Sequence, residues 1–366
     1  MPDQKKINNP PPRVLVAPLE WGLGHATRCI PIIDELLLQK CEVFIAAEGG
    51  IYHLLKSEFP TVNFLLLRGY RVKVAKHRIF FSLKMTGLLP QLLYVVYREN
   101  RWLRQVLTQH HIDAVISDNR PGLYNKKLKC VYITHQLLVK TGNSFTEKIA
   151  GLIHRHFINK YDECWVPDFE NNGIAGELSH VEKPSKNVKY IGALSRLNKI
   201  DQPEKKYELL ILLSGPEPQR TIFEKILVDQ LLSYKKRVLF VRGLPGTEKI
   251  FQSENDLVEI VNHISGDELN LALLQSEVTI SRSGYTTIMD LLKLKKKGIL
   301  VPTPGQKEQE YLAQHLMKKK IFFCVDQKNF ELHQALKEFK EFVFVKPSYD
   351  MEQYKFFVRE FIQSLK

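Results

Sequence analysis

Short apolar runs of strand length alternate with amphipathic helical patterns along the whole chain. In the first half, helical patterns occupy residues 30–39 and 100–108, and strands are predicted at residues 13–19, 42–47, 62–67, 113–117, 130–134, 163–166 and 188–191. Apolar strands separated by helices are typical of a parallel sheet that helices cover on both faces. The pattern therefore predicts an α/β fold with a doubly wound sheet.

A second series of alternating strands and helices follows a polar segment. Strands are predicted at residues 209–213, 237–241, 258–261, 278–280, 299–301 and 322–325, and helices at residues 221–232, 266–274, 286–294, 309–317 and 330–339. We expect an N-terminal domain of residues 1–195, a linker of residues 196–206, a C-terminal domain of residues 207–347 and a last helix within residues 348–366. Two Rossmann-like domains that face each other place a cleft at the carboxyl ends of both sheets, where ligands bind in such folds.

Composition agrees with two domains of ordinary size. The chain has 366 residues, of which 44% are hydrophobic and 25% are charged, as in soluble globular proteins. The first twelve residues are polar and proline-rich and lack the apolar core of a signal peptide. The cysteines have no metal-ligand spacing and fit free thiols in a reducing cytoplasm: Cys29, Cys41, Cys130, Cys164 and Cys324.

Positive charge concentrates in one segment. The formal net charge is +13, and residues 68–104 hold nine Lys or Arg against one acidic residue, Glu99, among several apolar and aromatic runs. This mixture suits a surface that dips into an anionic membrane, although a pair of core helices with solvated basic faces fits equally well. Lys84, Pro90 and Gln91 interrupt the stretch that approaches spanning length. No nucleic-acid motif accompanies the charge, so we expect no nucleic-acid partner. The cations expected to face a membrane or an acceptor are Arg71, Lys73, Arg78 and Lys84.

Residues 281–290 join a predicted strand to a predicted helix through small residues. Ser281, Arg282, Ser283 and Gly284 form the turn, and Asp290 follows within the helix. Such a turn exposes backbone N–H groups and the positive end of a helix, which suit a phosphate. The carboxylate of Asp290 is an acceptor for a sugar hydroxyl. Phosphate donors followed by an acid predict a nucleotide-sugar pocket.

A similar junction begins at Ser214. It contains Gly215 and Arg220, and its amides, hydroxyl and guanidinium can bind a diphosphate. Arg242, after the strand at residues 237–241, is a further candidate donor. The Gly-Lys-Ser/Thr ending of a P-loop is missing, and a proline-stiffened surface turn is the alternative interpretation.

Two later junctions complete the expected donor site. Backbone groups around Ile264 can read the edge of a flat base, although residues 265–268 fit a capped helix start equally well. Glu308 and Gln309 begin a helix after the strand at residues 299–301 and can hold sugar hydroxyls. The alternative for that segment is a solvated helix N-terminus.

The first predicted strand leads into a glycine-rich turn. Gly22 and Gly24 allow a tight turn with close backbone approach, and His25 and Arg28 lie three residues apart on the first helical turn, on one face. We expect this face to point into the cleft, where His25 is the candidate general base and Arg28 belongs to the acceptor side.

Other interpretations of this region stay open. A dinucleotide site needs a glycine where Thr27 stands, although Glu48 could imitate its ribose-binding acid. His25 also fits a helix-capping role. Asp118 and His135 end two later strands and are the alternative bases or acceptor contacts.

Residues 278–313 resemble the donor-binding half of the lipid-linked N-acetylglucosamine transferase of peptidoglycan assembly and its relatives. In that family the strand ends in Ser/Cys-Arg-Ala/Ser-Gly and an acidic residue holds the ribose, a position that Asp290 occupies. Gln309 matches the amide near the donor sugar, whereas Leu312 replaces the family's next asparagine. The glycine-rich turn with His25 matches the family's acceptor-facing turn. The spacing of residues 22–28 also resembles a nucleotide-sugar hydrolase of nonulosonate synthesis.

The resemblance implies a GT-B fold with a C-terminal helix that crosses back to the N-terminal domain, a uridine-linked donor, a role in the cell envelope and no obligatory metal or cofactor. The chain indeed lacks an Asp-x-Asp motif. We therefore expect a cytoplasmic, membrane-peripheral glycosyltransferase whose acceptor is lipid-linked. The alternatives are a nucleotide-sugar hydrolase of the same fold, a non-catalytic nucleotide-sugar-binding protein, and an epimerase, for which no acid–base set is evident.

Overall fold

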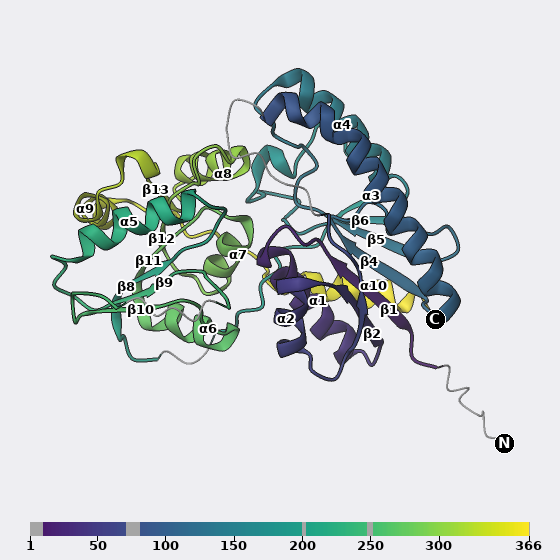
Figure 1. Ribbon diagram of the computed structural model, residues 1–366, viewed down its shortest axis with the longest axis horizontal. Coiled ribbons are helices and arrows are strands. Elements are labelled where there is room, and N and C mark those ends of the chain that lie inside the picture. Colours follow the sequence, from purple (N-terminus) through teal and green to yellow (C-terminus); the bar gives the residue numbers. More distant parts are fainter. Residues whose placement is uncertain (1–9, 71–80, 200–202, 247–251, 366) are drawn as a thin grey trace.

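Two parallel sheets, each covered by helices on both faces, make up the protein (Figure 1). The structure is a computed structural model that describes residues 10–70, 81–199, 203–246 and 252–365, with residues 81–89 described as helical backbone alone. Within these ranges the N-terminal sheet has the order β3-β2-β1-β4-β5-β6-β7. Its strands are β1 (Arg13–Pro18), β2 (Glu42–Ala47), β3 (Asn63–Leu66), β4 (Ala114–Asp118), β5 (Lys129–Ile133), β6 (Glu163–Val166) and β7 (Val188–Tyr190).

The C-terminal sheet has the order β10-β9-β8-β11-β12-β13. Its strands are β8 (Tyr207–Leu212), β9 (Val238–Val241), β10 (Val258–Val261), β11 (Ser276–Ser281), β12 (Gly298–Leu300) and β13 (Phe323–Cys324). The strand order reverses direction between β1 and β4 in the first sheet and between β8 and β11 in the second. Such switch points open a crevice at the carboxyl ends of the strands.

Helices fill the connections between the strands. Those before the linker are α1 (Leu23–Leu38), α2 (Gly49–Glu58), α3 (Phe81–Gln109) and α4 (Ser144–Ile158), with a 3-10 turn, η2 (Gly176–Leu178). Those after it are α5 (Gln219–Leu231), α6 (Gly266–Gln275), α7 (Tyr285–Lys293), α8 (Lys307–Lys318), α9 (Leu332–Glu341) and α10 (Tyr354–Gln363), with a 3-10 turn, η3 (Gln327–Asn329). The predicted α/β class with two facing doubly wound domains is confirmed.

The alternation of side chains along each strand divides the core. In β1, Val14 and Val16 pack with α1, α2 and α10, whereas Leu15 and Ala17 pack with α3 on the opposite face. All four are fully buried. Because successive side chains of a strand point to opposite faces, a strand covered on both sides must be apolar throughout. This is why the strands are visible as continuous apolar runs.

The helices agree less well with the sequence pattern. The helical pattern at residues 30–39 predicts the second part of α1, which already begins at Leu23. Neither α2 nor α4 is among the predicted helices. α2 begins with two glycines, and most of α4 is partly exposed. Few residues of either helix are buried, namely Ile51 and Leu55 of α2 and Phe157 and Ile158 of α4.

The last helix, α10, packs against the N-terminal domain rather than the C-terminal one (yellow in Figure 1). Val358 and Phe361 belong to the core that contains α1, and Arg359 Nε donates to Glu35 Oε1 at 2.7 Å. The chain therefore crosses between the domains twice, once between β7 and β8 and once before α10. Two crossings restrain the relative movement of the domains more than one does.

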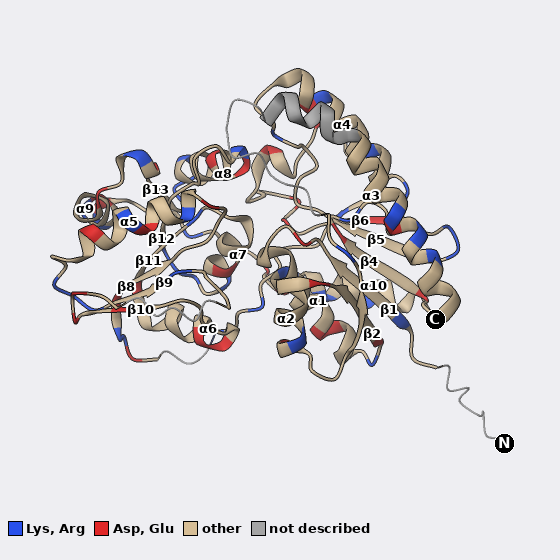
Figure 2. Cartoon of the chain, in the orientation of Figure 1, with Lys and Arg blue, Asp and Glu red and all other residues tan. Residues whose placement is uncertain are grey.

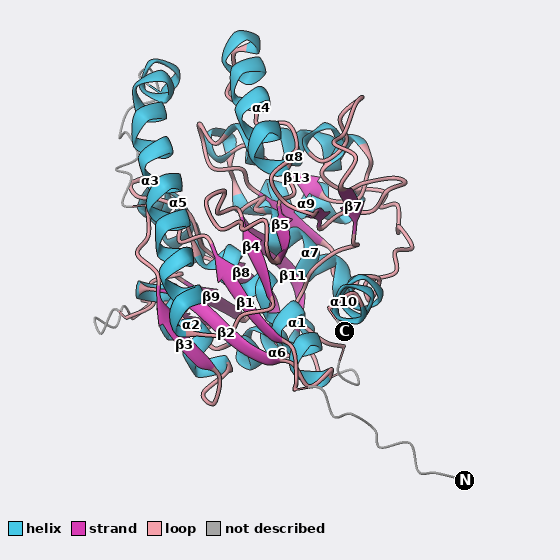
Figure 3. Ribbon diagram, turned by 90° about the vertical axis from the view of Figure 1, so that its right-hand side faces the viewer, coloured by secondary structure: helices cyan, strands magenta, loops and turns pink. Residues whose placement is uncertain are grey.

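Viewed from the side, α3 and α4 stand as two long helices that project from the N-terminal domain (Figure 3). Among the described residues, no helix combines the length and the apolar character that crossing a bilayer requires.

Candidate functional site

The two switch points face each other across the domain interface. The start of α7, after β11, touches the start of α1, after β1, because Thr286 Oγ1 donates to the carbonyl of Gly24 at 3.2 Å. Tyr285 Oη donates to the carbonyl of Pro167 at 2.5 Å, and its ring stacks on His135 with centroids 4.3 Å apart. Direct contacts therefore hold the crevice closed at this point.

The geometry of the first turn explains its glycines. Gly22 caps α1 with φ of 136°, in the region that favours glycine. A Cβ at Gly24 would lie 3.1 Å from Thr286 Oγ1, which is tighter than ordinary contact. The turn therefore depends on glycine for the bend at Gly22 and for the approach of α7 at Gly24.

Five charged or titratable side chains meet at this interface. His25 and Arg28 come from α1, Asp118 ends β4, His135 follows β5, and Glu308 begins α8 in the other domain. His25 Nδ1 lies 2.8 Å from Asp118 Oδ2, and Arg28 Nε donates to both Asp118 oxygens at 3.0 Å. Arg28 Nη1 lies 3.0 Å from His135 Nδ1, and His135 Nε2 lies 2.7 Å from Glu308 Oε1. We call these five residues the crevice cluster.

Burial and charge decide the protonation of the crevice cluster. The Asp118 carboxyl is fully buried, which alone would raise its pKa, but the charges of Arg28 and His25 lower it overall. The pKa of His25 is lowered by burial first and by the Arg28 charge second, against the opposite effect of Asp118. For Glu308, burial opposes ionisation, yet His135 and Arg28 lower the pKa. At neutral pH the cluster thus pairs an ionised carboxylate with a neutral imidazole, an arrangement suited to general base catalysis.

On the C-terminal side, the turn after β11 presents a helix end. Gly284 is the N-cap of α7 and no side chain caps this end. Ser281 Oγ, Arg282 Nε and Thr303 Oγ1 are buried and have no hydrogen-bond partner in the described part of the chain. Unpaired buried polar atoms next to an uncapped helix N-terminus are typical of a place where a polar ligand binds.

The three arginines expected near the phosphates all have internal partners. Arg282 is buried, donates to the carbonyls of Val301, Pro302 and Gln219, and lies over the Phe223 ring; burial lowers its pKa to about 10. Arg220 bonds Glu217 and Glu224, and Arg242 bonds Glu224 and Asn262. Gly215, in the same loop, has φ of 103° and would place a Cβ 3.4 Å from Thr303 Oγ1. These guanidinium groups therefore support the loops directly.

Asp290 lies at the point where the domains are joined. Ser195 Oγ, in the segment between the domains, donates to Asp290 Oδ1 at 2.6 Å. Burial raises the pKa of Asp290 to about 6, although Ser195 and Arg196 act in the opposite direction. Arg196 also bonds Glu58 of α2 at 2.7 Å, and a Cβ at Gly266 would touch both side chains. Asp290 therefore contacts the interdomain segment through Ser195.

The start of α8 has two roles. Gln309 Oε1 accepts from the backbone N–H of Thr303 at 2.9 Å, and the Gln309 carbonyl accepts from Ser283 Oγ at 2.9 Å. Glu308 instead faces the N-terminal domain through His135. Ile264 is partly buried beside the core of the C-terminal domain. Its neighbour Ser265 forms a capping box with Glu268, the alternative that the sequence left open.

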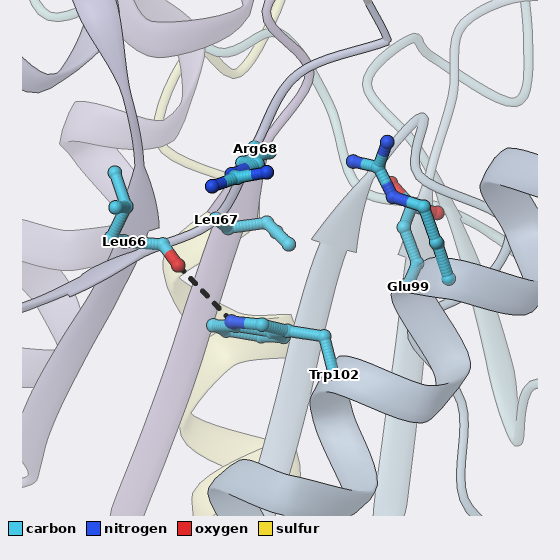
Figure 4. Close-up of a pocket in the computed structure, with 6 residues that line it drawn as sticks. Leu66, Leu67, Arg68, Glu99 and Trp102 are labelled. Carbon is cyan, nitrogen blue, oxygen red and sulfur yellow. Dashed lines mark hydrogen bonds between the residues drawn. The ribbon is translucent and has the colours of Figure 1, made fainter.

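Only part of the basic segment belongs to the described structure. Arg71, Lys73 and Arg78 lie outside the described residues, and Lys84 lies in α3 where side chains are not described. Of the other cations of this segment, Arg98, Arg101 and Arg104 lie on α3, where Lys and Arg are blue in Figure 2. A pocket of about 150 Å³ lies between the end of β3 and α3, where Trp102 Nε1 donates to the carbonyl of Leu66 at 3.0 Å (Figure 4).

A larger groove of about 680 Å³ separates α3 from α4. We call it the α3–α4 groove. Its lining is apolar and aromatic with three basic residues, and the described lining contains no acidic residue: Leu93, Val96, Tyr97, Asn100, Arg104, Tyr124, Leu152, Ile153, His156, Phe157 and Lys160. Tyr97 and Leu152 are 62% and 70% exposed, so this groove is an apolar surface open to solvent.

Comparison with known proteins agrees with this architecture. Residues 227–364 match the glycosyltransferase family 28 C-terminal domain. The chain has a GT-B fold, and the matched residues are similar to that family's C-terminal domain. The fold and this match support glycosyl transfer as the class of activity, so the suspected GT-B glycosyltransferase resemblance is confirmed. No curated protein matches the sequence.

Solved GT-B structures superpose on nearly the whole chain. The glycotransferase of kitacinnamycin has a TM-score of 0.64 with 14% identity and covers 98% of this chain and 96% of its own. MurG of Acinetobacter baumannii has a TM-score of 0.52 with 12% identity, covering 97% and 94%. UGT89C1 of Arabidopsis thaliana, solved with UDP-L-rhamnose, has a TM-score of 0.61 with 10% identity, covering 98% and 94%. At these identities the similarity concerns the GT-B fold alone.

Sequence reasoning missed several residues of the GT-B crevice. Ser195 had no expected role, and Tyr285 and Thr286 were only part of a quoted motif. Their contacts join segments more than 90 residues apart, so no local sequence pattern predicts them. Arg28 and Glu308, expected on opposite sides of the site, instead both contact His135.

Proposed function

We propose that this protein transfers a sugar from a uridine-diphosphate sugar to a hydroxyl of a lipid-linked acceptor, without an obligatory metal. The observation that carries the proposal is the position of His25. Its Nδ1 lies 2.8 Å from the buried Asp118 carboxylate. His25 also follows Gly24, which contacts the uncapped start of α7. A base and an anion-binding helix end at one interface match the two needs of glycosyl transfer.

The chemistry follows from these positions. His25 Nε2 takes the proton of the acceptor hydroxyl while Nδ1–H donates to Asp118, which stabilises the imidazolium that forms. The acceptor oxygen bonds the anomeric carbon, and the bond from that carbon to the diphosphate oxygen breaks with its electron pair. The leaving diphosphate gains charge at the start of α7, where free N–H groups and the helix dipole stabilise it.

The remaining donor contacts come from the C-terminal domain. Asp290 exchanges its bond to Ser195 for the ribose hydroxyls, and Ile264 provides backbone groups for the base. Glu308 and Gln309 accept from the sugar hydroxyls once Glu308 leaves His135. The uridine preference rests on the family resemblance. It is consistent with the UDP-L-rhamnose complex of the similar UGT89C1 fold.

The acceptor side rests on the N-terminal domain. The α3–α4 groove combines an open apolar surface with Arg104, His156 and Lys160, the features that hold a protein on an anionic membrane. We propose that this surface lies on the cytoplasmic face of the membrane and delivers a lipid-linked acceptor to His25.

Two measurements test the proposal. A thermal-shift screen of nucleoside diphosphates and their sugars identifies the donor, because a ligand that binds the native state raises the unfolding temperature. The selected donor is then incubated with lipid-linked acceptors, with and without a chelator. Transfer that survives the chelator supports the proposal, whereas free sugar formed equally well without acceptor identifies a hydrolase. Tight binding of a nucleoside diphosphate without any turnover identifies a non-catalytic binding protein.

A further inference from the structure

Arg28 lies deeper in the crevice cluster than either histidine. Its side chain is 4% exposed, against 18% for His25. Besides Nε, which reaches both Asp118 oxygens, Arg28 Nη2 also donates to Asp118 Oδ1. Arg28 Nη1 lies at His135 Nδ1 and Arg28 Nη2 at His25 Nδ1. A single guanidinium therefore contacts the carboxylate and both imidazoles.

His25 Nδ1 has two competing neighbours. Asp118 Oδ2 and Arg28 Nη2 each lie 2.8 Å from it. An ionised carboxylate accepts hydrogen bonds only, and a guanidinium donates only. If Nδ1 is protonated, it can donate to Asp118. If Nδ1 is unprotonated, it can accept from Arg28. The two contacts belong to two different tautomers of His25.

Counting donors and acceptors favours the contact with Arg28. Asp118 already accepts from Arg28 Nε and Nη2, so it stays bonded without His25. The second Nη2 hydrogen has His25 Nδ1 as its acceptor, and leaving a buried N–H unpaired is costly. His135 follows the same logic, since its Nδ1 accepts from Arg28 and its Nε2–H donates to Glu308.

We propose that Arg28 is a positioning residue that sets the tautomer and the charge of His25. In the ligand-free protein Arg28 keeps the imidazole of His25 neutral, with its proton on Nε2. When the Nη2–Nδ1 hydrogen bond breaks, the proton moves to Nδ1, Nδ1–H donates to Asp118, and Nε2 is free to act as the base. The inference rests on the proposed function for its catalytic meaning, but its structural content does not depend on turnover.

The groups around His25 shift its pKa in opposite directions. Those that face it are Arg28 on its own helix, Asp118 from β4, His135 from the loop after β5 and Glu308 from α8. After burial, Arg28 is the largest influence that lowers the pKa of His25, and Asp118 opposes it. Removing the guanidinium therefore raises the pKa of His25 and frees Nδ1–H for Asp118.

Nuclear magnetic resonance of the full chain tests this directly. Long-range ¹H–¹⁵N correlations report which imidazole nitrogen carries the proton. In the ligand-free wild type we expect His25 with a bare Nδ1. In Arg28→Met, and in the equally neutral Arg28→Gln if the first variant folds poorly, the titration midpoint of His25 rises by about one pH unit or more. In Arg28→Met the proton also moves to Nδ1.

Arg120→Met is the matched control. Arg120 is 1% exposed and its Nε donates to Glu99 at 2.8 Å, so its loss also breaks a buried ion pair in the same domain. We expect it to lower stability and leave the tautomer of His25 unchanged.

The acid limb of kcat/KM gives a second readout. In Arg28→Met the pKa of this acid limb rises together with the titration midpoint of His25. Below that pKa, kcat/KM falls about tenfold for each pH unit. A wild-type Nδ1–H signal, or an unchanged tautomer and midpoint in both Arg28 variants, overturns the inference. If no donor is turned over, the proposed function fails while the resonance experiment still decides the role of Arg28.

Discussion

The two sides of the interdomain crevice differ in how they use charge. On the N-terminal side, Arg28 and Asp118 are buried together in contact with His25, so the protonation of an imidazole depends on them. On the C-terminal side, Arg220 bonds carboxylates and Arg282 bonds carbonyls of neighbouring loops, and no side chain caps the start of α7. One side is arranged to move a proton, and the other to receive an anion through its backbone.

The difference shows that a charged residue near a crevice need not touch the ligand. Arg282 carries a charge beneath the turn, where it bonds the ends of β12 and α5. Its removal would disturb the shape of the turn before any contact with phosphate. Arg28 holds no loop together in this way, and its contacts are with titratable side chains.

The largest expected effect tests the N-terminal side. His25→Ala should lower turnover by about 10²–10⁴-fold because the acceptor hydroxyl loses its base, while nucleotide binding stays nearly normal. Turnover and nucleoside diphosphate affinity are measured on the same preparation. His53→Ala, an exposed histidine on α2, is the control and should change neither. Normal turnover in His25→Ala would show that His25 is not the general base.

The next effect concerns the pH dependence of stability at Asp290. The ordinary pKa of an aspartate side chain is 3.8, and that of Asp290 in the folded protein is about 6. The native state thus binds more protons than the unfolded state between these values, so stability falls as pH rises through this window. The loss is complete above about pH 6 and is about 3 kcal/mol at most. Asp290→Asn removes it.

Chemical denaturation of the wild type and Asp290→Asn between about pH 4 and 7 measures this loss. We expect Asp290→Asn to gain stability relative to wild type as pH rises, since its amide oxygen still accepts from Ser195. A constant difference between the two proteins at every pH would contradict the burial of an ionising carboxyl at this site.

The same variant also tests the C-terminal side for its ligand. Asp290→Asn should weaken binding of the nucleoside diphosphate by about 1–2 kcal/mol, or roughly 5–30-fold, because hydrogen bonds to a charged acceptor are lost. Calorimetry or thermal shift measures the affinity. Asp267→Asn, an exposed change in the same domain, is the control. Equal affinities for wild type and Asp290→Asn would show that Asp290 does not bind the ribose hydroxyls.

The smallest effect concerns exposed charge. Arg104→Glu and Lys160→Glu in the α3–α4 groove should each weaken binding to vesicles with anionic lipid by roughly 1 kcal/mol or more, an effect that salt screens. Lys337→Glu, exposed on α9 of the other domain, makes the same charge change and serves as the control. If all three variants bind alike, the basic surface of the N-terminal domain has no special role at a membrane.

Strands were the most predictable part of this protein. β2, β6 and β10 have the predicted bounds, and in β2 and β6 every residue but the first is buried. α4 was missed although its cap was visible, since Asn143 accepts from the N–H groups of Phe145 and Thr146. Capping residues are local signals, whereas the apolar stripe depends on what a helix packs against.

Candidate site residues were predictable as a set of loops but not as a set of contacts. His25, Asp118 and His135 follow strands of one parallel sheet, so their loops must meet at one edge. The sequence placed Glu308 with the donor sugar, and the structure bonds it to His135 of the opposite domain. Such a contact depends on how two domains close, which no local pattern encodes.

By itself, the sequence determined the alternating elements and the glycine turns at the strand ends, because periodicity and backbone freedom are local properties. Tertiary structure alone decided that Arg28 lies between two imidazoles and that Arg282 faces carbonyls. Burial, the partner of a charge and the state of a proton depend on atoms brought together from distant segments, so they appear only when the two sheets are folded and joined.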